Sequence, residues 1–360
     1  MKNTARTRFT ATSNDLVVDT QLSRFPGSRY MGSKQAILPD LFRVFSALEF
    51  TTALDAFSGS AIVSYLLKTM GKSVTSNDFL NFSFHTANAC IANDRTLLLP
   101  DEVSSLLLPH HSPGHFIEDT FRGLYFTDQE NIWLENVSAH IRDLQDNYKQ
   151  SIAYAALARA CLRKRPRGLF TYTGLRYDDG RKDLRRSLEE QFFNAVDLFN
   201  RAVFDNGQLN YSYNSDVFAL PQDLSFDLVY IDTPYVSPHS DNDYGRRYHF
   251  VEGLTRYWKG LEILYDTSTK KFKRIPSLFD SKNTINTGFS MLFERFAESI
   301  LVVSYSSNGI PNKEELYEIL QRYKRQVEVI EIDHRYSFGT HSHKVGNNQN
   351  LVKEYIFVGI

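Results

Sequence analysis

The sequence lacks several features that mark specialised classes of protein. Its 360 residues include only two cysteines, Cys90 and Cys161, which are too few for a disulfide framework and lack the paired spacing of a zinc site. No apolar run approaches the roughly 20 residues that span a bilayer. The first 28 residues contain no apolar stretch followed by a small-residue cleavage site. We therefore expect a cytoplasmic protein without a metal or a membrane contact, in which both cysteines are buried thiols.

The chain also lacks an excess of charge. Its 41 Lys and Arg side chains almost balance 42 Asp and Glu, which leaves a net charge of −1. A protein whose whole surface binds nucleic acid would be strongly basic, so the composition disfavours that class. The hydrophobic fraction of 42% excludes a disordered chain, and the length allows two modules or one large α/β unit with an insertion.

Strand and helix patterns alternate at the two ends of the chain. The stretch 51–60 predicts a strand that runs into a tight glycine turn, 61–69 a helix, and 73–77 a second strand. Two strands joined by one helix form a βαβ unit, which implies a parallel sheet. Further strands are predicted at 209–213, 226–231, 299–304, 327–332 and 354–358, with a helix at 313–323.

The middle of the chain has mostly helical patterns. Amphipathic helices are predicted at 129–146, 151–163 and 184–203. The simplest architecture is an α/β sheet built from residues 1–85 and 206–360, interrupted by a mostly helical insertion at 86–205.

Three turns follow predicted strands, and ligands of open α/β sheets bind at these carboxyl ends. Gly59, in the turn 55–60, allows close backbone approach to a ligand, although such a turn also serves packing alone. Asp78 can accept both ribose hydroxyls of a nucleoside or can cap a helix. Neither G-x-G-x-x-G nor G-x-x-x-x-G-K-[ST] occurs here, which disfavours an ordinary dinucleotide or nucleoside triphosphate site.

The tetrapeptide Asp232-Thr233-Pro234-Tyr235 is the most informative of these turns. It follows the buried strand predicted at 226–231 and combines a carboxylate, a stiff turn and an aromatic ring. The Asp232 side chain and the Thr233 carbonyl can accept from an exocyclic amino group while Tyr235 stacks on the same heterocycle. A type I turn with Pro at its second position explains the tetrapeptide equally well.

Four short motifs occur in the same order as in a known family. They are Arg29-Tyr30-Met31-Gly32-Ser33-Lys34, Asp55-Ala56-Phe57-Ser58-Gly59-Ser60, Asn214-Ser215-Asp216-Val217-Phe218 and Asp232-Thr233-Pro234-Tyr235. With them the chain resembles the DNA adenine-N6 methyltransferases, in particular the class typified by the bacterial Dam enzyme. The segment Tyr248-His249-Phe250 is also similar to members of that class. Thr233 replaces the first proline of the family's D-P-P-Y, and Ala61 stands where a second glycine is usual.

The resemblance implies a Rossmann-like, S-adenosylmethionine-dependent methyltransferase sheet with an inserted, mostly helical target-recognition domain. It implies methyl transfer to N6 of a flipped-out adenine in double-stranded DNA, without a metal. Asp232 and the Thr233 carbonyl would hold the amino group so that its lone pair points at the methyl group. The resemblance assigns to the cofactor Tyr30 and Lys34 (methionine portion and carboxylate), Asp55, Phe57 and Gly59 (amino-acid end), Asp78 (ribose) and Asp216 (adenine).

A dense basic segment lies in the predicted insertion. Residues 159–186 include ten basic and three acidic side chains, a local charge of +7, so the rest of the chain sums to −8. Interleaved aromatic residues and the turn Asp178-Asp179-Gly180 indicate a short hairpin. Such a surface neutralises phosphates and places arginines at guanine edges, and in the related enzymes the insertion recognises DNA sequence. The predicted DNA contacts are Arg163, Lys164, Arg165, Arg167, Tyr172, Arg176, Arg181 and Lys182.

Residues 244–257, with Arg246 and Arg247, are predicted to form a loop over the flipped base. Two other functions stay open. One is N4-cytosine methylation, which uses similar chemistry but typically has Ser where Asp232 stands. The other is a catalytically impaired DNA-binding regulator of the same fold, for which the departures at Thr233 and Ala61 leave room. A restriction-modification system, with a cognate restriction endonuclease as partner, is compatible with the methyltransferase interpretation.

Overall fold

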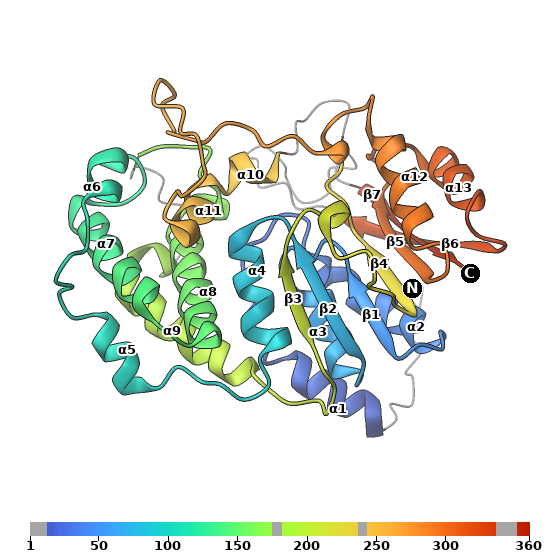
Figure 1. Ribbon diagram of the computed structural model, residues 1–360, viewed down its shortest axis with the longest axis horizontal. Coiled ribbons are helices and arrows are strands. Elements are labelled where there is room, and N and C mark those ends of the chain that lie inside the picture. Colours follow the sequence, from blue (N-terminus) through green and yellow to red (C-terminus); the bar gives the residue numbers. More distant parts are fainter. Residues whose placement is uncertain (1–12, 175–181, 237–242, 336–350) are drawn as a thin grey trace, which may run out of the picture.

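A seven-stranded sheet lies beside a group of helices in the computed structural model, which describes residues 13–174, 182–236, 243–335 and 351–360 (Figure 1). The strand order is β3-β2-β1-β4-β5-β7-β6. The strands are β1 (Thr52–Asp55), β2 (Ser73–Asp78), β3 (Tyr211–Asn214), β4 (Leu228–Ile231), β5 (Ile300–Ser306), β6 (Val327–Arg335) and β7 (Leu351–Gly359).

Both ends of the chain contribute to this one sheet, as the sequence predicts. Strands β1 to β5 pair in parallel, whereas β7 runs antiparallel between β5 and β6. Asp55, the last residue of β1, lies beside Ser76 of β2 and Tyr230 of β4. The carboxyl ends of the three central strands therefore meet at one edge, where the predicted ligand turns follow.

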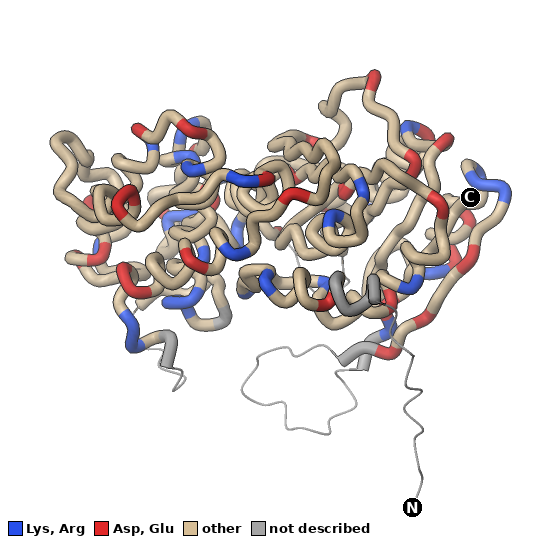
Figure 2. The backbone as a smooth tube through the Cα atoms, turned by 90° about the horizontal axis from the view of Figure 1, so that it is seen from below, with Lys and Arg blue, Asp and Glu red and all other residues tan. Residues whose placement is uncertain are grey.

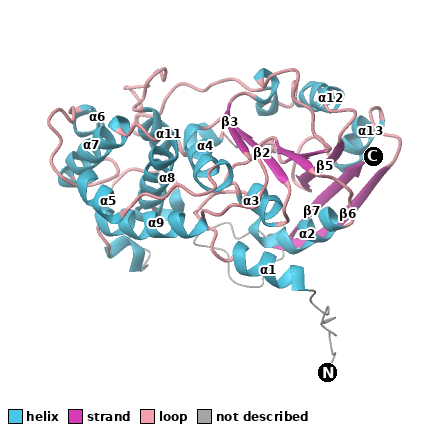
Figure 3. Cartoon of the chain, turned by 60° about the horizontal axis from the view of Figure 1, so that its bottom comes forward, coloured by secondary structure: helices cyan, strands magenta, loops and turns pink. Residues whose placement is uncertain are grey.

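Each face of the sheet packs against its own hydrophobic core. Ala53 and Leu228 belong to a core shared with α2 and α3, whereas Leu54 and Val229 belong to a core shared with α12 and α13 (Figure 3). Burial on both faces explains the almost continuous apolar run of β4. The covering helices are α1 (Ser13–Leu22), α2 (Leu38–Ser46), α3 (Ile62–Thr69), α12 (Ile285–Arg295) and α13 (Lys313–Gln321), with the short helical turns η1 (Lys34–Ile37), η5 (Val217–Ala219) and η6 (Leu278–Asp280).

Helices dominate the middle of the chain. The predicted helices at 129–146, 151–163 and 184–203 correspond to α7, α8 and α9, and α7 and α9 begin at the capping boxes of Thr127 and Ser187. Helix α8 packs against α9 and α4, and one hydrophobic core continues from the sheet into these helices. The helical elements here are α4 (Asn81–Ala87), the π-helical turn η2 (Asn88–Ala92), α5 (Pro100–Leu106), α6 (Phe116–Phe121), α7 (Asp128–Asp143), α8 (Asn147–Lys164), η3 (Pro166–Gly168), η4 (Lys182–Arg185) and α9 (Leu188–Ala202).

The predicted loop at 244–257 is wrong, because this segment is helical. It forms α10 (Tyr244–Arg247) and α11 (His249–Arg256), and α11 packs against α4 and α8. Phe250, Val251 and Leu254 share one fully buried face, and their spacing is that of a helix. The segment is therefore part of the scaffold that joins the helices to the sheet.

Two expectations from composition can be compared with the fold. Cys90 and Cys161 are buried free thiols, as predicted. Within the described ranges, no helix combines the length and hydrophobicity needed to cross a membrane. Figure 2 shows Lys and Arg positions mixed with Asp and Glu positions along the backbone on both halves of the molecule.

Candidate active site

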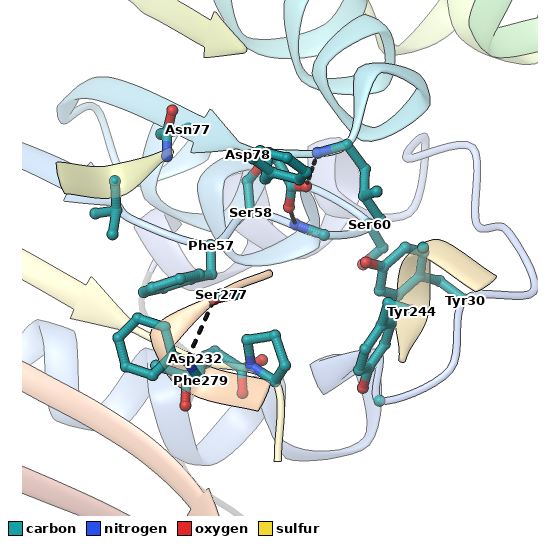
Figure 4. Close-up of a pocket in the computed structure, with 18 of the residues that line it drawn as sticks. Tyr30, Phe57, Ser58, Ser60, Asn77, Asp78, Asp232, Tyr244, Ser277 and Phe279 are labelled. Atoms are coloured by element: carbon teal, nitrogen blue, oxygen red, sulfur yellow. Dashed lines mark hydrogen bonds between the residues drawn. The ribbon is translucent and has the colours of Figure 1, made fainter. Parts of the chain in front are cut away.

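A pocket opens at the carboxyl edge of β1, β2 and β4 (Figure 4). The three predicted turns line it together, through Phe57 to Ser60, Asp78 and Asp232 to Pro234. Its walls also include residues from the segments 30–34, 243–245 and 272–280. Side chains from distant parts of the sequence therefore converge where open α/β sheets bind ligands.

Asp55 presents a free carboxylate oxygen in this pocket. Its Oδ2 accepts from the backbone N–H of Ser64 at 3.1 Å and from the Ser64 hydroxyl at 2.5 Å. Its buried Oδ1 has no hydrogen-bond partner among the described residues, and burial raises the pKa of Asp55 to about 7. A buried carboxylate with an unpaired oxygen is suited to a cationic ligand group.

The glycine turn is shaped by a neighbouring ring. Gly59 has φ of +50°, and a Cβ at this position would lie 3.0 Å from the ring of Tyr30. The Gly59 N–H donates to Asp78 at 2.7 Å, and the other oxygen of Asp78 accepts from the Leu80 N–H at 2.8 Å. Burial raises the pKa of Asp78 to about 6. Asp78 therefore fixes the turn and also lines the pocket. It does not cap α4, whose N-cap residue is Leu80, and its contact with a ribose stays a prediction.

The rings of Phe57 and Phe279 line one wall of the pocket, and Phe218 packs on Phe279 without lining the pocket itself. The ring of Phe279 lies 5.2 Å from that of Phe57, edge to face, and 6.1 Å from that of Phe218, nearly parallel. Asp216 lines the same wall and accepts from the Phe218 N–H at 2.9 Å. Sequence reasoning missed Phe279, for which the only signal was the capping box formed by Ser277 and Asp280.

Tyrosines form the opposite wall. Tyr30 stacks on Tyr248 with 5.3 Å between ring centroids and on Tyr244 with 5.9 Å, and Figure 4 shows Tyr30 and Tyr244 across the pocket from Phe57. The Tyr248 hydroxyl accepts from the Met31 N–H at 2.7 Å. The prediction missed Tyr244 because its segment was expected to be a loop.

Lys34 has ionic partners that the sequence did not predict. Its Nζ lies 2.7 Å from Oδ1 of Asp232, 2.7 Å from the Tyr235 hydroxyl and 3.4 Å from Glu354. The side chain is 6% exposed. Lys34 is therefore the ionic partner of the predicted catalytic carboxylate. It also lines the pocket, and its contact with the carboxylate of the cofactor stays a prediction.

Tyr235 is also a partner of Asp232. It is 9% exposed, its ring packs edge to face on Tyr305, and it is absent from the lining of the pocket. Its hydroxyl lies 2.9 Å from Asp232 and 3.0 Å from Glu354. The Tyr235 hydroxyl therefore contacts both carboxylates, and the stacking of its ring on a base stays a prediction.

Thr233 and Pro234 do line the pocket. Thr233 is 3% exposed, and its buried Oγ1 has no hydrogen-bond partner among the described residues. Burial raises the pKa of Asp232, whereas Lys34 lowers it. The pocket thus presents a carboxylate and a polar turn side by side.

Some basic side chains of the segment 159–186 are buried and hydrogen-bonded within the protein. Arg165 is 2% exposed and donates to the carbonyls of Tyr125, Gly174 and Tyr172, so its predicted DNA contact is wrong. Arg159 is similarly buried and donates to the Gly27 carbonyl. The segment therefore exposes less positive charge than its composition suggests.

The other predicted DNA contacts differ in their surroundings. Lys164 pairs with Glu130 at 2.9 Å, Arg163 at the end of α8 is partly buried, and the Tyr172 ring is 62% exposed. Arg167 lies in η3 and Lys182 begins η4. Arg176 and Arg181, together with the predicted hairpin turn, lie outside the described residues.

The basic segment adjoins the pocket. The Phe170 N–H donates to the Arg247 carbonyl at 3.0 Å, which fixes the segment to α10 and so to Tyr244 on the pocket wall. In the part of the chain that the structure describes, no group of three or more His, Cys, Asp or Glu side chains could hold a metal ion.

Comparison with known proteins identifies relatives of this chain. The relatives include the type II methyltransferase M2.HphI of Haemophilus parahaemolyticus, 29% identical over 87% of this chain and 93% of the relative. They also include the modification methylase StsI of Streptococcus sanguinis, 26% identical over 82% of this chain and 46% of the relative, and the type II methyltransferase M.NlaIII of Neisseria lactamica, 22% identical over 84% and 89%. This chain thus spans about half the length of the StsI methylase and most of the other two.

The family model of the D12 class N6 adenine-specific DNA methyltransferases matches residues 30–319, which include the four motifs except Arg29 and every strand of the sheet from β1 to β5. The chain belongs to the D12 class of N6 adenine-specific DNA methyltransferases.

Proposed function

We propose that the pocket binds S-adenosylmethionine and that Asp232 and the Thr233 carbonyl hold N6 of an adenine flipped out of double-stranded DNA. Membership in the D12 class supports the reaction, and the convergence of the three strand-end turns supports the place. The observation that carries the cofactor assignment is the unpaired, buried Oδ1 of Asp55 in the pocket.

The residues of the pocket fit the parts of this cofactor. Asp55 would accept from the ammonium group, the Phe57 to Gly59 turn would lie along the amino-acid end, and Tyr30 would contact the methionine portion. Asp78 would accept from the ribose hydroxyls. Asp216 would accept from the amino group of the cofactor's adenine, whose ring Phe279, stacked on Phe218, would flank.

The chemistry at N6 depends on hydrogen-bond acceptors. S-adenosylmethionine supplies a methyl group on a sulfonium that is already activated. Asp232 and the Thr233 carbonyl would accept from the adenine amino group and turn its lone pair away from the ring. As N6 gains the methyl group it loses one proton, which the Asp232 carboxylate is placed to receive.

We assign DNA recognition to residues 86–205, with residues 1–85 and 206–360 as the catalytic unit. Two observations support this division: the middle of the basic segment is bonded to α10 near the pocket through Phe170, and Tyr172 of the same segment is exposed. Candidate contacts are Arg163, Lys164, Arg167, Tyr172, Arg176, Arg181 and Lys182. The names of the relatives favour a role in a type II restriction-modification system, with a cognate endonuclease as partner.

The substitution Asp232→Asn tests the assignment. It keeps the volume of the side chain but removes the charge, so transfer of tritiated methyl groups to unmethylated duplex DNA should fall at least about a hundredfold. Cofactor affinity in calorimetry should change less than about threefold, because Asp232 is not among the residues assigned to the cofactor. Undiminished activity of the variant would refute the site.

Analysis of the product base completes the test. Digestion of the wild-type product should yield N6-methyladenine. A product of N4-methylcytosine would instead indicate the N4-cytosine methyltransferase. DNA binding without cofactor binding would indicate the DNA-binding regulator.

A further inference from the structure

A buried carboxylate that the sequence analysis did not single out lies beneath the proposed catalytic residue. Glu354 comes from β7, the antiparallel strand between β5 and β6, and is 2% exposed. Its Oε1 lies 3.0 Å from the Tyr235 hydroxyl and 3.4 Å from Nζ of Lys34. Both of these groups also contact Oδ1 of Asp232. A second acidic side chain therefore shares the partners of Asp232.

The Tyr235 hydroxyl cannot serve both carboxylates at once. It carries one hydrogen, and Lys34 donates to its oxygen at 2.7 Å. When the hydroxyl donates to Glu354, it cannot donate to Oδ1 of Asp232, which then accepts from the ammonium of Lys34 but not from Tyr235. The hydrogen bond to Glu354 thus decides how strongly Asp232 is neutralised.

Asp232 faces more acidic side chains than basic ones. The groups that face it are the ammonium of Lys34, the carboxylates of Glu354 and Asp55, and the hydroxyls of Tyr235 and Tyr230. Lys34 lowers the pKa of Asp232, and Glu354 raises it. Two carboxylates in hydrogen-bond range of one ammonium leave Asp232 a stronger acceptor than a simple ion pair would.

We propose that Glu354 is a positioning residue for methyl transfer. It accepts the hydrogen bond of Tyr235 and partly neutralises the ammonium of Lys34, both of which also contact Asp232. Asp232 is thereby a stronger acceptor for N6 of adenine. This inference rests on the proposed function, because it places the adenine amino group at Asp232. Glu354 itself contacts neither substrate nor cofactor, since it is absent from the lining of the pocket.

The decisive variant is Glu354→Gln, which keeps the shape and an acceptor for Tyr235 but removes the charge. We expect the single-turnover rate of methyl transfer, at saturating cofactor and duplex DNA, to fall about tenfold or more. The acid limb of its pH profile should move to lower pH, because Asp232 loses a neighbouring negative charge. Glu354→Asp, which keeps the charge, should restore part of the rate.

The matched control is Glu328→Gln, the same substitution at an exposed position of the adjacent strand β6. It should keep the wild-type rate and pH profile. The inference is overturned if Glu354→Gln behaves like this control, if Glu354→Gln and Glu354→Asp lose activity equally, or if the loss comes with a loss of cofactor binding in calorimetry. A wild-type protein that forms no N6-methyladenine would instead refute the proposed function.

Discussion

At the scale of single residues, the pocket contains buried carboxyl groups, and burial disfavours their ionised form. Burial raises the pKa of Asp55 to about 7 and that of Asp78 to about 6. In each case the ionised form accepts backbone or hydroxyl hydrogen bonds that partly offset the burial. A cationic group bound at Asp55 should therefore favour the ionised form of that carboxyl.

Cofactor binding should consequently depend on pH. The ammonium of S-adenosylmethionine favours ionised Asp55, so the measured affinity should fall as the pH decreases through about 7. Between pH 8 and pH 6 the ionised fraction of the free carboxyl falls about tenfold, and the Kd in calorimetry should rise about as much. Asp55→Asn should bind weakly at both pH values. An affinity of the wild type that does not change over this range would contradict the role of Asp55.

At the scale of elements, one arginine shapes the segment that leads from α8 toward the pocket. Arg165 donates to three carbonyls of 125, 172 and 174 and lies 5.1 Å from the Tyr125 ring centroid. The segment it holds also bonds to α10 through Phe170. Composition alone suggested a DNA contact at Arg165, because a buried and an exposed arginine look the same in a sequence.

Arg165→Ala should therefore destabilise the fold. It leaves buried carbonyls without donors, so we expect a loss of about 2 to 4 kcal/mol in the free energy of unfolding, measured by urea denaturation. The matched variant is Tyr172→Ala, which removes an exposed ring of the same segment. It should leave stability within about 0.5 kcal/mol and weaken duplex binding in fluorescence anisotropy. If instead Arg165→Ala weakened duplex binding without loss of stability, and Tyr172→Ala destabilised the fold, Arg165 would be the DNA contact and Tyr172 the structural residue.

At the scale of the whole molecule, the charge of −1 conceals a local excess of basic residues. The excess is smaller at the surface than in the sequence, because Arg159 and Arg165 are buried. The middle of the segment, at Phe170, is bonded to α10 near the pocket. Under the proposed function, the exposed part of this excess would attract DNA locally while the overall charge stays near neutral.

The salt dependence of binding should reveal this local excess. Each phosphate contact contributes a slope of about −0.9 to the plot of log affinity against log salt, so three to six contacts predict a slope of about −3 to −5 for duplex DNA. Tyr172→Ala should lower the affinity without changing the slope. A slope near zero for the wild type would exclude phosphate contacts by the basic segment.

The sequence by itself determined the sheet and the turns at its edge. Apolar runs such as 226–231 can be buried only inside a sheet covered on both faces, and local glycine and proline patterns mark where the strands end. These signals depend on neighbouring residues, which is why all seven strands lie where the pattern places them, within a few residues.

Only the tertiary structure decided which side chains meet. The pairing of Lys34 with Asp232, the burial of Tyr235, and the approach of Glu354 from β7 join residues up to about three hundred positions apart in sequence. The helical form of 244–256 likewise depends on packing against α4 and α8. A local pattern carries no information on such partners, because burial and charge pairing are fixed only when distant elements pack together.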